Sequence, residues 1–235
     1  MANVTHAEPH HTSGQVLNRL RAAVLGANDG ITSVAGIVVG VAGATNSKPA
    51  IVTAGAAGLL AGALSMAAGE YVSVSSQRDT EKALLEKERS ELQQHPSEEL
   101  AELTGLYEAK GLSRATATQV ANELTAHNAY AAHVDAELGI DPSNLMSPWQ
   151  AAGASASSFF VGAMIPLVAI ILPPQSIRVP VAFAAVVVAL AITGVLSARA
   201  GQADVAKAVR RVVAGGIIAM VVTYGIGRLL HGSGI

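Results

Sequence analysis

Five apolar stretches, each about 20 residues long, constrain the fold of this chain more than any other feature of its sequence. They cover about residues 22–44, 50–74, 149–172, 179–198 and 212–231, and a helix needs roughly 20 mostly apolar residues to cross a bilayer. Only 14% of the 235 residues are charged, against about 25% in ordinary soluble domains, and the mean hydropathy is +0.42. We therefore predict an all-α, multi-pass integral membrane protein with five transmembrane helices.

The charges are divided unevenly between the second and third apolar stretches and the rest of the chain. Residues 78–141 hold 13 of the 17 acidic and 6 of the 15 basic residues, a balance of −7, which leaves +5 for the remainder. This pattern predicts an acidic polar insert in a basic-flanked membrane body, and it argues against nucleic acid as a partner. The absence of cysteine excludes disulfides, thiolate metal sites and a cysteine nucleophile.

The positive-inside rule orients the predicted spans. With a cytoplasmic N-terminus, six basic residues of the short loops lie inside and three lie outside; the inner set is Arg19, Arg21, Arg199, Lys207, Arg210 and Arg211. We therefore expect the N-terminus and the insert in the cytoplasm. The predicted organisation is a flexible polar tail (1–18), spans one and two (19–77), a cytoplasmic metal-binding helical domain (78–141) and spans three to five (142–235). The polar N-terminus indicates no signal peptide, and short tails favour a bacterial plasma membrane over a vacuole.

The insert is predicted to contain three helices. The first continues the second span without Gly or Pro, the second begins near Pro96, and the third runs from a Ser113 cap to about Leu138, before Gly139. In the membrane body, small residues recur at four-residue spacing, as in Gly26/Gly30, Gly36/Gly40 and Gly58/Gly62. Such stripes let helices approach closely in lipid, either within one subunit or between two. Because five helices make a thin wall for a pathway, we expect a homodimer.

Asp29 lies inside the first predicted span, beside Asn28. A carboxylate at mid-membrane costs about 2.5–3.5 kcal/mol on insertion scales, so it normally faces a polar pathway or a partner. The alternative is a structural hydrogen bond or a position shallow enough to reach water. Met66 and Glu70 lie four residues apart on one face of the second span, and together a thioether and a carboxylate suit a borderline metal such as iron(II).

Paired carboxylates on the insert form a second candidate site. Each pair is three residues apart on its helix, and the third helix adds a histidine and a glutamate four apart; the set is Glu88, Glu91, Glu99, Glu102, His133 and Glu137. Oxygen-rich clusters of this kind bind divalent cations. The alternative is a solvated helix face on which the acids pair with Lys82, Lys87 and Arg89.

Enzyme signatures are absent from the sequence. It contains no Walker loop, no HExxH and no GxSxG, and Glu123 and His127 lie four residues apart rather than the three of a ferritin-like di-iron site. We predict that the protein is not an enzyme and holds no cofactor other than transported or bound metal ions.

Four segments in order, RAAVLGANDGITS, GALSMAAGEYVSVSSQRDTEKA, ELGI and SSFFVGAMIPL, resemble the vacuolar iron transporter family over roughly residues 19–231. That resemblance implies five-span homodimers exchanging iron(II) or manganese(II) for protons. It implies that Asp29 and Met66 line the ion path, with Glu70 a proton or metal carrier, and that the insert glutamates bind metal. Where some members carry adjacent methionines, this chain has His133 and Val134, which puts nitrogen in place of sulfur and bears on metal preference.

The leading hypothesis is a transporter moving divalent iron, manganese or both out of the cytoplasm in exchange for protons. The alternative is a membrane-anchored metal sensor or buffer, which binds ions through the insert without transporting them.

Overall fold

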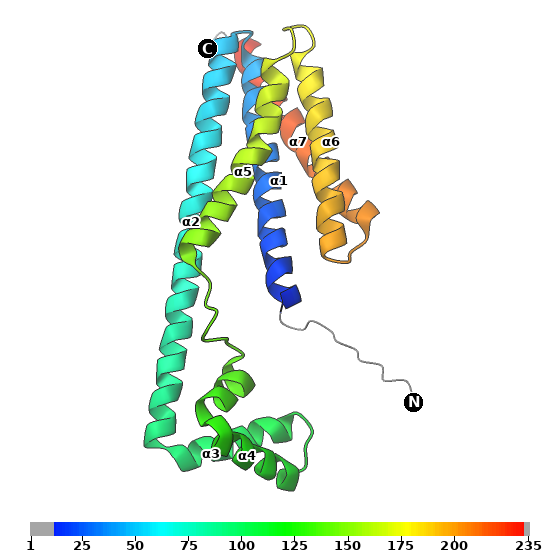
Figure 1. The fold of residues 1–235 in the computed structure, drawn as a ribbon. Helices are drawn as coiled ribbons and strands as arrows, with labels where there is room; N and C mark the ends of the chain where they lie inside the picture. Colours follow the sequence, from blue (N-terminus) through cyan, green and yellow to red (C-terminus); the bar gives the residue numbers. More distant parts are fainter. Residues whose placement is uncertain (1–11, 233–235) are drawn as a thin grey trace. The chain divides into compact units, whose positions relative to one another are not determined.

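The computed structural model describes residues 12–232, with side chains from residue 23 on. Within that range it contains helices and no strand (Figure 1). The elements are α1 (Thr12–Ala44), α2 (Lys48–Gln94), α3 (Pro96–Ala109), α4 (Arg114–His133), the π-helical turn η1 (Val134–Leu138), α5 (Pro148–Ile171), α6 (Arg178–Ala200) and α7 (Val205–Gly232). The chain forms two compact units: residues 71–148, here the insert unit, and the remainder, here the membrane unit.

Five of the described helices are long and apolar enough to cross a bilayer: α1 from Ala23, α2, α5, α6 and α7. The prediction of five spans is confirmed at this level. With 47 residues, α2 is about 70 Å long at 1.5 Å per residue, more than twice the thickness of a hydrocarbon core. Its apolar half ends near Glu70, and its polar half belongs to the insert unit.

The start of α1 differs from the expected boundary of the N-terminal tail. The helix begins at Thr12, inside the segment 1–18 that was predicted to be flexible. Thr12 and Ser13 are residues that favour helix starts, and no Pro or further Gly interrupts the chain between Gln15 and Leu25. Residues 1–11 of the predicted tail lie outside the described residues.

The core of the membrane unit is built around α1. Ile31, Val34 and Val38 are at most 1% exposed, and they pack in one apolar cluster with side chains of α2, α5, α6 and α7. In lipid every backbone amide and carbonyl must be paired within the protein, and helices achieve this locally. The apolar runs therefore fold as helices, and side-chain packing around α1 arranges them.

The glycine stripes are used for packing within the chain. A Cβ at Gly30 would collide with the Phe159 backbone of α5, and one at Gly162 of α5 would collide with the Ala27 carbonyl of α1. Gly36 and Gly40 face Thr223 of α7, so the second stripe also contacts a helix of the same chain. The stripes therefore pack helices within one subunit, and they give no support to the expected homodimer.

The insert unit contains the three predicted helical segments. The polar end of α2 continues to Gln94, α3 has Pro96 in its first turn, and Ser113 caps α4 by accepting a hydrogen bond from the Thr116 amide. Helices α3 and α4 pack against each other, with Leu103, Ala117 and Ala121 fully buried between elements of this unit. This small core holds the side chains of the candidate metal centre.

Candidate metal centre

The polar half of α2 turns Glu88 toward the interior of the insert unit. Leu85 lies one helical turn earlier and is 8% exposed, and Glu88 is only 3% exposed. Residues three apart on a helix share a face, so Glu88 lies on the face that Leu85 packs inward. A carboxylate in that position is desolvated unless a cation or a set of donors compensates it.

Helix α3 brings in Glu99 by the same rule. Glu99 precedes Leu103 by four residues, and the two are 7% and 0% exposed. Glu98 and Glu99 lie in the first turn of α3, where the partial positive charge of the helix N-terminus favours acids. Glu98 faces solvent and lies 3.6 Å from the Nδ1 atom of His95, so only Glu99 enters the core.

The third helix is not continuous, contrary to the prediction of one helix from Ser113 to Leu138. Asn128 has non-helical backbone angles (φ −164°, ψ 94°), and its Oδ1 accepts a hydrogen bond from the Ala131 amide, as a helix cap does. After His133 the helix widens into a π turn, in which the Gly139 amide donates to the Val134 carbonyl, and Gly139 ends it in a left-handed conformation (φ 60°). His133 and Glu137 therefore lie on a short separate segment.

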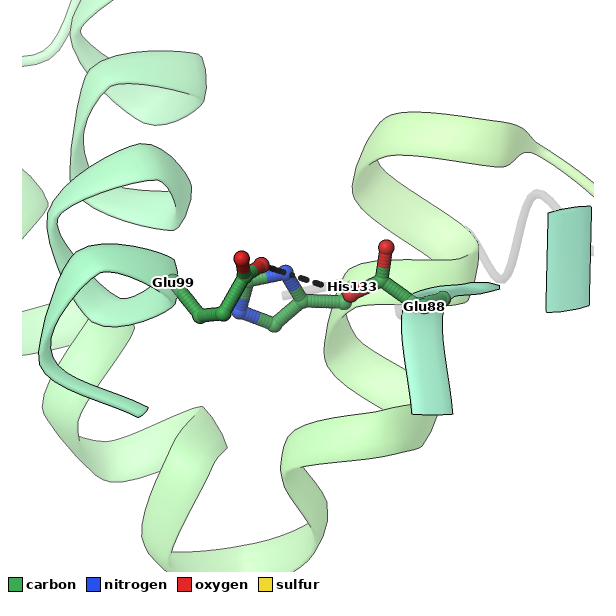
Figure 2. Close-up of side chains that lie close together, drawn as sticks. All are labelled: Glu88, Glu99 and His133. Atoms are coloured by element: carbon green, nitrogen blue, oxygen red, sulfur yellow. Dashed lines mark ion pairs between the residues drawn. The ribbon is translucent and has the colours of Figure 1, made fainter. Parts of the chain in front are cut away.

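Three side chains from three helical segments meet in the insert unit (Figure 2). The Nδ1 atom of His133, which is 0% exposed, lies 3.0 Å from Oε1 of Glu88 and 3.5 Å from Oε2 of Glu99. One ligand atom from each residue lies within 4.8 Å of the others. Two donors about 2.1 Å from one ion and roughly 90–110° apart are separated by about 3.0–3.4 Å. The 3.0 Å separation falls in this range and the 3.5 Å separation lies just outside it, so a small shift of Glu99 would bring these donors to the spacing of a shared cation.

Hydrogen bonding does not explain this cluster. Oε1 of Glu88 and both ring nitrogens of His133 are buried and have no hydrogen-bond partner, although Oε1 lies 3.0 Å from Nδ1, an ion-pair distance when the ring is protonated. Buried polar atoms are nearly always paired, so each exception calls for an explanation such as an ion. Carboxylate oxygen and imidazole nitrogen both offer lone pairs to a metal. The cluster has the donors of a metal site.

The raised pKa values of the buried carboxyl groups also favour a cation in this cluster. Burial, followed by the negative charges of Glu137 and Glu99, raises the pKa of Glu88 from its ordinary 4.5 to about 7. Burial also raises the pKa of Glu99, with Glu102 adding to the rise and His133 opposing it. Both shifts arise first from burial and then from neighbouring negative charge, and both disfavour the ionised carboxylates in the absence of a cation. A divalent ion between them would supply that charge.

The other predicted ligands lie at the edge of this trio. Glu137 Oε2 is 4.0 Å from His133 Nδ1, and its side chain is 28% exposed. Glu91 is 35% exposed and accepts a hydrogen bond from Lys87 Nζ at 2.8 Å, and Glu102 faces solvent. The six predicted residues thus form an inner trio and an outer trio. Of the outer three, Glu137 is the one that lies within 4.0 Å of His133.

In the membrane unit, Asp29 and Asn28 lie on α1 and are partly buried. Oδ1 of Asp29 accepts a 2.8 Å hydrogen bond from the hydroxyl of Ser33, one turn on. Oδ1 of Asn28 is buried without a hydrogen-bond partner. Among the side chains described from residue 23 on, no basic group forms an ion pair with Asp29. Sequence reasoning missed Ser33, although its four-residue spacing from Asp29 was a usable signal.

Met66 and Glu70 lie on α2, and Phe159 of α5 contacts both this helix and α1. Met66 packs against the apolar core, and Glu70 is half-buried. The backbone of Phe159 packs on Gly30, next to Asp29, while its ring packs on Gly62, one turn before Met66. Phe159 therefore joins the two helices that carry the predicted path residues. Its place is a tertiary feature without a signal in the local sequence.

Residues 20–228 match the model of the VIT family. The chain belongs to the VIT family. The resemblance expected from the four sequence segments is confirmed, and the match runs through both units.

Curated relatives in the VIT family align with nearly the whole chain. A vacuolar iron transporter from Acanthamoeba castellanii is 42% identical over 223 residues, which are 94% of this chain and 82% of that protein. Vacuolar iron transporter homolog 5 from Oryza sativa subsp. japonica is 40% identical over 219 residues, 93% of this chain and 83% of the relative. Vacuolar iron transporter homolog 3 from Arabidopsis thaliana is 36% identical over 212 residues, 90% and 82% of the two chains.

Proposed function

We propose that this protein transports divalent transition-metal ions across a membrane, with iron(II) as the first candidate cargo and manganese(II) as the second. Membership of the VIT family, relatives named as iron transporters and five helices able to span a bilayer support transport. A transporter is not an enzyme class. The observation that carries the metal assignment is the buried trio of Glu88, Glu99 and His133, in which Oε1 of Glu88 and both ring nitrogens of His133 have no hydrogen-bond partner.

The insert unit captures the ion in this proposal. Two carboxylates and one imidazole form a mixed oxygen and nitrogen donor set, which suits borderline divalent metals better than soft monovalent copper. With Glu137 closing on the ion, the charge of three carboxylates exceeds that of a divalent cation by one. The surplus keeps the affinity dependent on proton concentration, because a proton competes with the metal for the same oxygens.

The membrane unit carries the ion in this proposal, with Asp29, Met66, Asn28 and Glu70 along the path. The unpaired Oδ1 of Asn28 and the Asp29 carboxylate offer oxygen ligands within an otherwise apolar helix. Protons move in exchange, since a carboxylate releases metal when it is protonated. The N-terminus and the insert are assigned to the cytoplasm by the positive-inside rule, and the assembly is assigned as a homodimer.

Flux through proteoliposomes tests the proposal. Purified protein in vesicles loaded with a metal-sensitive dye should take up iron(II) faster when the vesicle interior is more acidic than the outside, because protons that leave the vesicle then drive the exchange. Asp29→Asn should reduce flux to the background of empty vesicles while leaving metal binding by the insert intact. His133→Leu should weaken capture, and Glu86→Gln serves as the matched control because Glu86 is 73% exposed and pairs with Arg89.

The outcomes separate transport from its alternative. Metal binding without flux in the unaltered protein would support the sensor or buffer function and refute transport. Flux that does not respond to a pH gradient would remove proton exchange from the proposal. Equal rates for iron(II), manganese(II), calcium and zinc would refute the preference assigned to the mixed donor set.

A further inference from the structure

A long apolar groove runs along α6 on the surface of the membrane unit. One part, about 690 Å³, lies between α6, α5 and the Ala27–Ile31 turn of α1, and a second, about 490 Å³, continues it between α5 and α6. Ile165, Val181 and Ala185 line both parts. Small side chains of α6 form much of its floor, and Thr193 supplies the polar group at one end.

The groove has the length of a lipid chain in one leaflet. From Val181 to Thr193 is twelve residues, or about 18 Å of helix, against about 15 Å for half of a 30 Å hydrocarbon core. Exposed branched side chains stand along it, such as Val188 at 58% and Ile192 at 55%. A hydrocarbon chain in the groove would contact protein on several sides rather than only other lipid.

A single arginine lies on the same face of α6, about 10 Å of helix beyond the groove residue Ile192. The groove-lining residues of α6 recur as Val181, Ala185, Val188 and Ile192, and seven residues beyond Ile192 is Arg199, which lies on the same helix face. Arg199 is exposed in the last turn of α6. Among the side chains that the structure describes, no carboxylate forms an ion pair with it.

Further basic residues follow Arg199, and the acid among them does not neutralise their charge. Lys207, Arg210 and Arg211 follow on the first turns of α7, and the one acid between them, Asp204, accepts a hydrogen bond from the Lys207 amide instead of pairing with a cation. Gly194 of α6 packs against Val209 of α7, which brings these turns to one end of the helix pair. That end attracts anionic headgroups, each Lys or Arg contributing about 1 kcal/mol near such a surface.

We propose that an anionic phospholipid docks here, with one acyl chain in the groove between α5 and α6 and its phosphate against Arg199. A phospholipid carries an apolar chain and a negative phosphate in one molecule at the required separation. A second copy of this chain would have to supply both a ridge for the groove and a carboxylate for Arg199. Asp29 does not line the groove, although Ala27 and Ile31 on the same turn of α1 do, and the docking of a lipid does not require the proposed transport.

Native mass spectrometry of the full protein in detergent, titrated with dioleoyl-phosphatidylglycerol or dioleoyl-phosphatidylcholine, tests the proposal. Phosphatidylglycerol should bind more tightly and give a larger rise in melting temperature. Arg199→Gln should weaken phosphatidylglycerol about fivefold and phosphatidylcholine little. Arg228→Gln, an exposed arginine toward the far end of α7, is the matched control and should leave both lipids unchanged.

A second pair of variants tests the groove itself. Ala185→Phe fills the groove and should remove the tight adduct of either lipid. The control Ile218→Phe, at a position of α7 that is 63% exposed, should leave the adduct in place. Equal binding of the two lipids, or unchanged phosphatidylglycerol binding by Arg199→Gln, would overturn the headgroup assignment. A tight adduct retained by Ala185→Phe, or disulfide-linked dimers of Ala185→Cys formed in membranes, would overturn the groove assignment, the latter in favour of a second copy.

Discussion

Replacing Glu88 by glutamine should stabilise the metal-free insert unit at pH 8 and abolish its response to metal. The folded-state pKa of Glu88 is raised to about 7, above its ordinary 4.5. Folding therefore favours the protonated form, and the stability from this group is present below about pH 4.5 and is lost as the pH rises through 7. Glutamine has nearly the same size and cannot ionise. The variant therefore keeps the stability that the unaltered insert unit loses when Glu88 ionises at pH 8.

The size of this effect follows from the same two pKa values. A pKa moving from 4.5 to about 7 corresponds to about 3 kcal/mol at most in the metal-free protein at pH 8, or roughly 300-fold in an opening equilibrium. The titration belongs to the whole cluster, because Glu99 and Glu137 interact with Glu88. At pH 4.5 the variant and the unaltered protein should differ little.

Hydrogen exchange of the full chain in detergent measures the opening equilibrium of the insert unit, since exchange reports the opening of one region rather than global unfolding. Amides of α3 and α4 should exchange more slowly in Glu88→Gln than in the unaltered protein at pH 8 without metal. Adding manganese(II) should slow exchange only in the unaltered protein and in the Glu86→Gln control. Faster exchange in metal-free Glu88→Gln at pH 8, or metal protection equal to that of the control, would refute the buried-charge argument.

Three further predictions follow from the described contacts. His133→Leu removes two unpaired buried nitrogens, so the insert unit should stay folded while metal affinity measured by calorimetry falls at least about tenfold. Metal affinity of the unaltered protein should fall as the pH is lowered through 7, because protonated Glu88 cannot bind metal; constant affinity from pH 8 to 5 would contradict this. Gly30→Val should greatly reduce the yield of monodisperse protein by forcing α1 away from α5, whereas Gly69→Ala, which meets open space, should not.

The spans were predictable because the requirement behind them is local. A run long and apolar enough to cross a bilayer is visible in the sequence itself, and the first predicted span, 22–44, ends at Ala44, where α1 ends. The start of α3 at Pro96 and the cap of α4 at Ser113 were also visible, since both depend on backbone chemistry within one turn. Which helices pack together depends on contacts far apart in sequence, and no local pattern revealed it.

The candidate ligands were predictable as a set, but the inner three were not singled out. Glu88 and Glu91 have the same chemistry and share one helix face. The distinguishing signal is register with the apolar residues: Glu88 follows Leu85 by three and Glu99 precedes Leu103 by four, and these two acids are buried. The break at Asn128 gave no such signal, because asparagine occurs within many helices and the bend follows from tertiary packing.

The interlocked backbones of α1 and α5 limit how the membrane unit can move. Gly30 lies against the Phe159 backbone and Gly162 against the Ala27 carbonyl, with no side chain between the two helices at either point. Sliding one helix past the other by part of a turn would drive a neighbouring Cβ into the opposing main chain. In the proposed transport cycle these two helices are therefore expected to tilt or shift together as one rigid pair, with the conformational change located where other helices meet them.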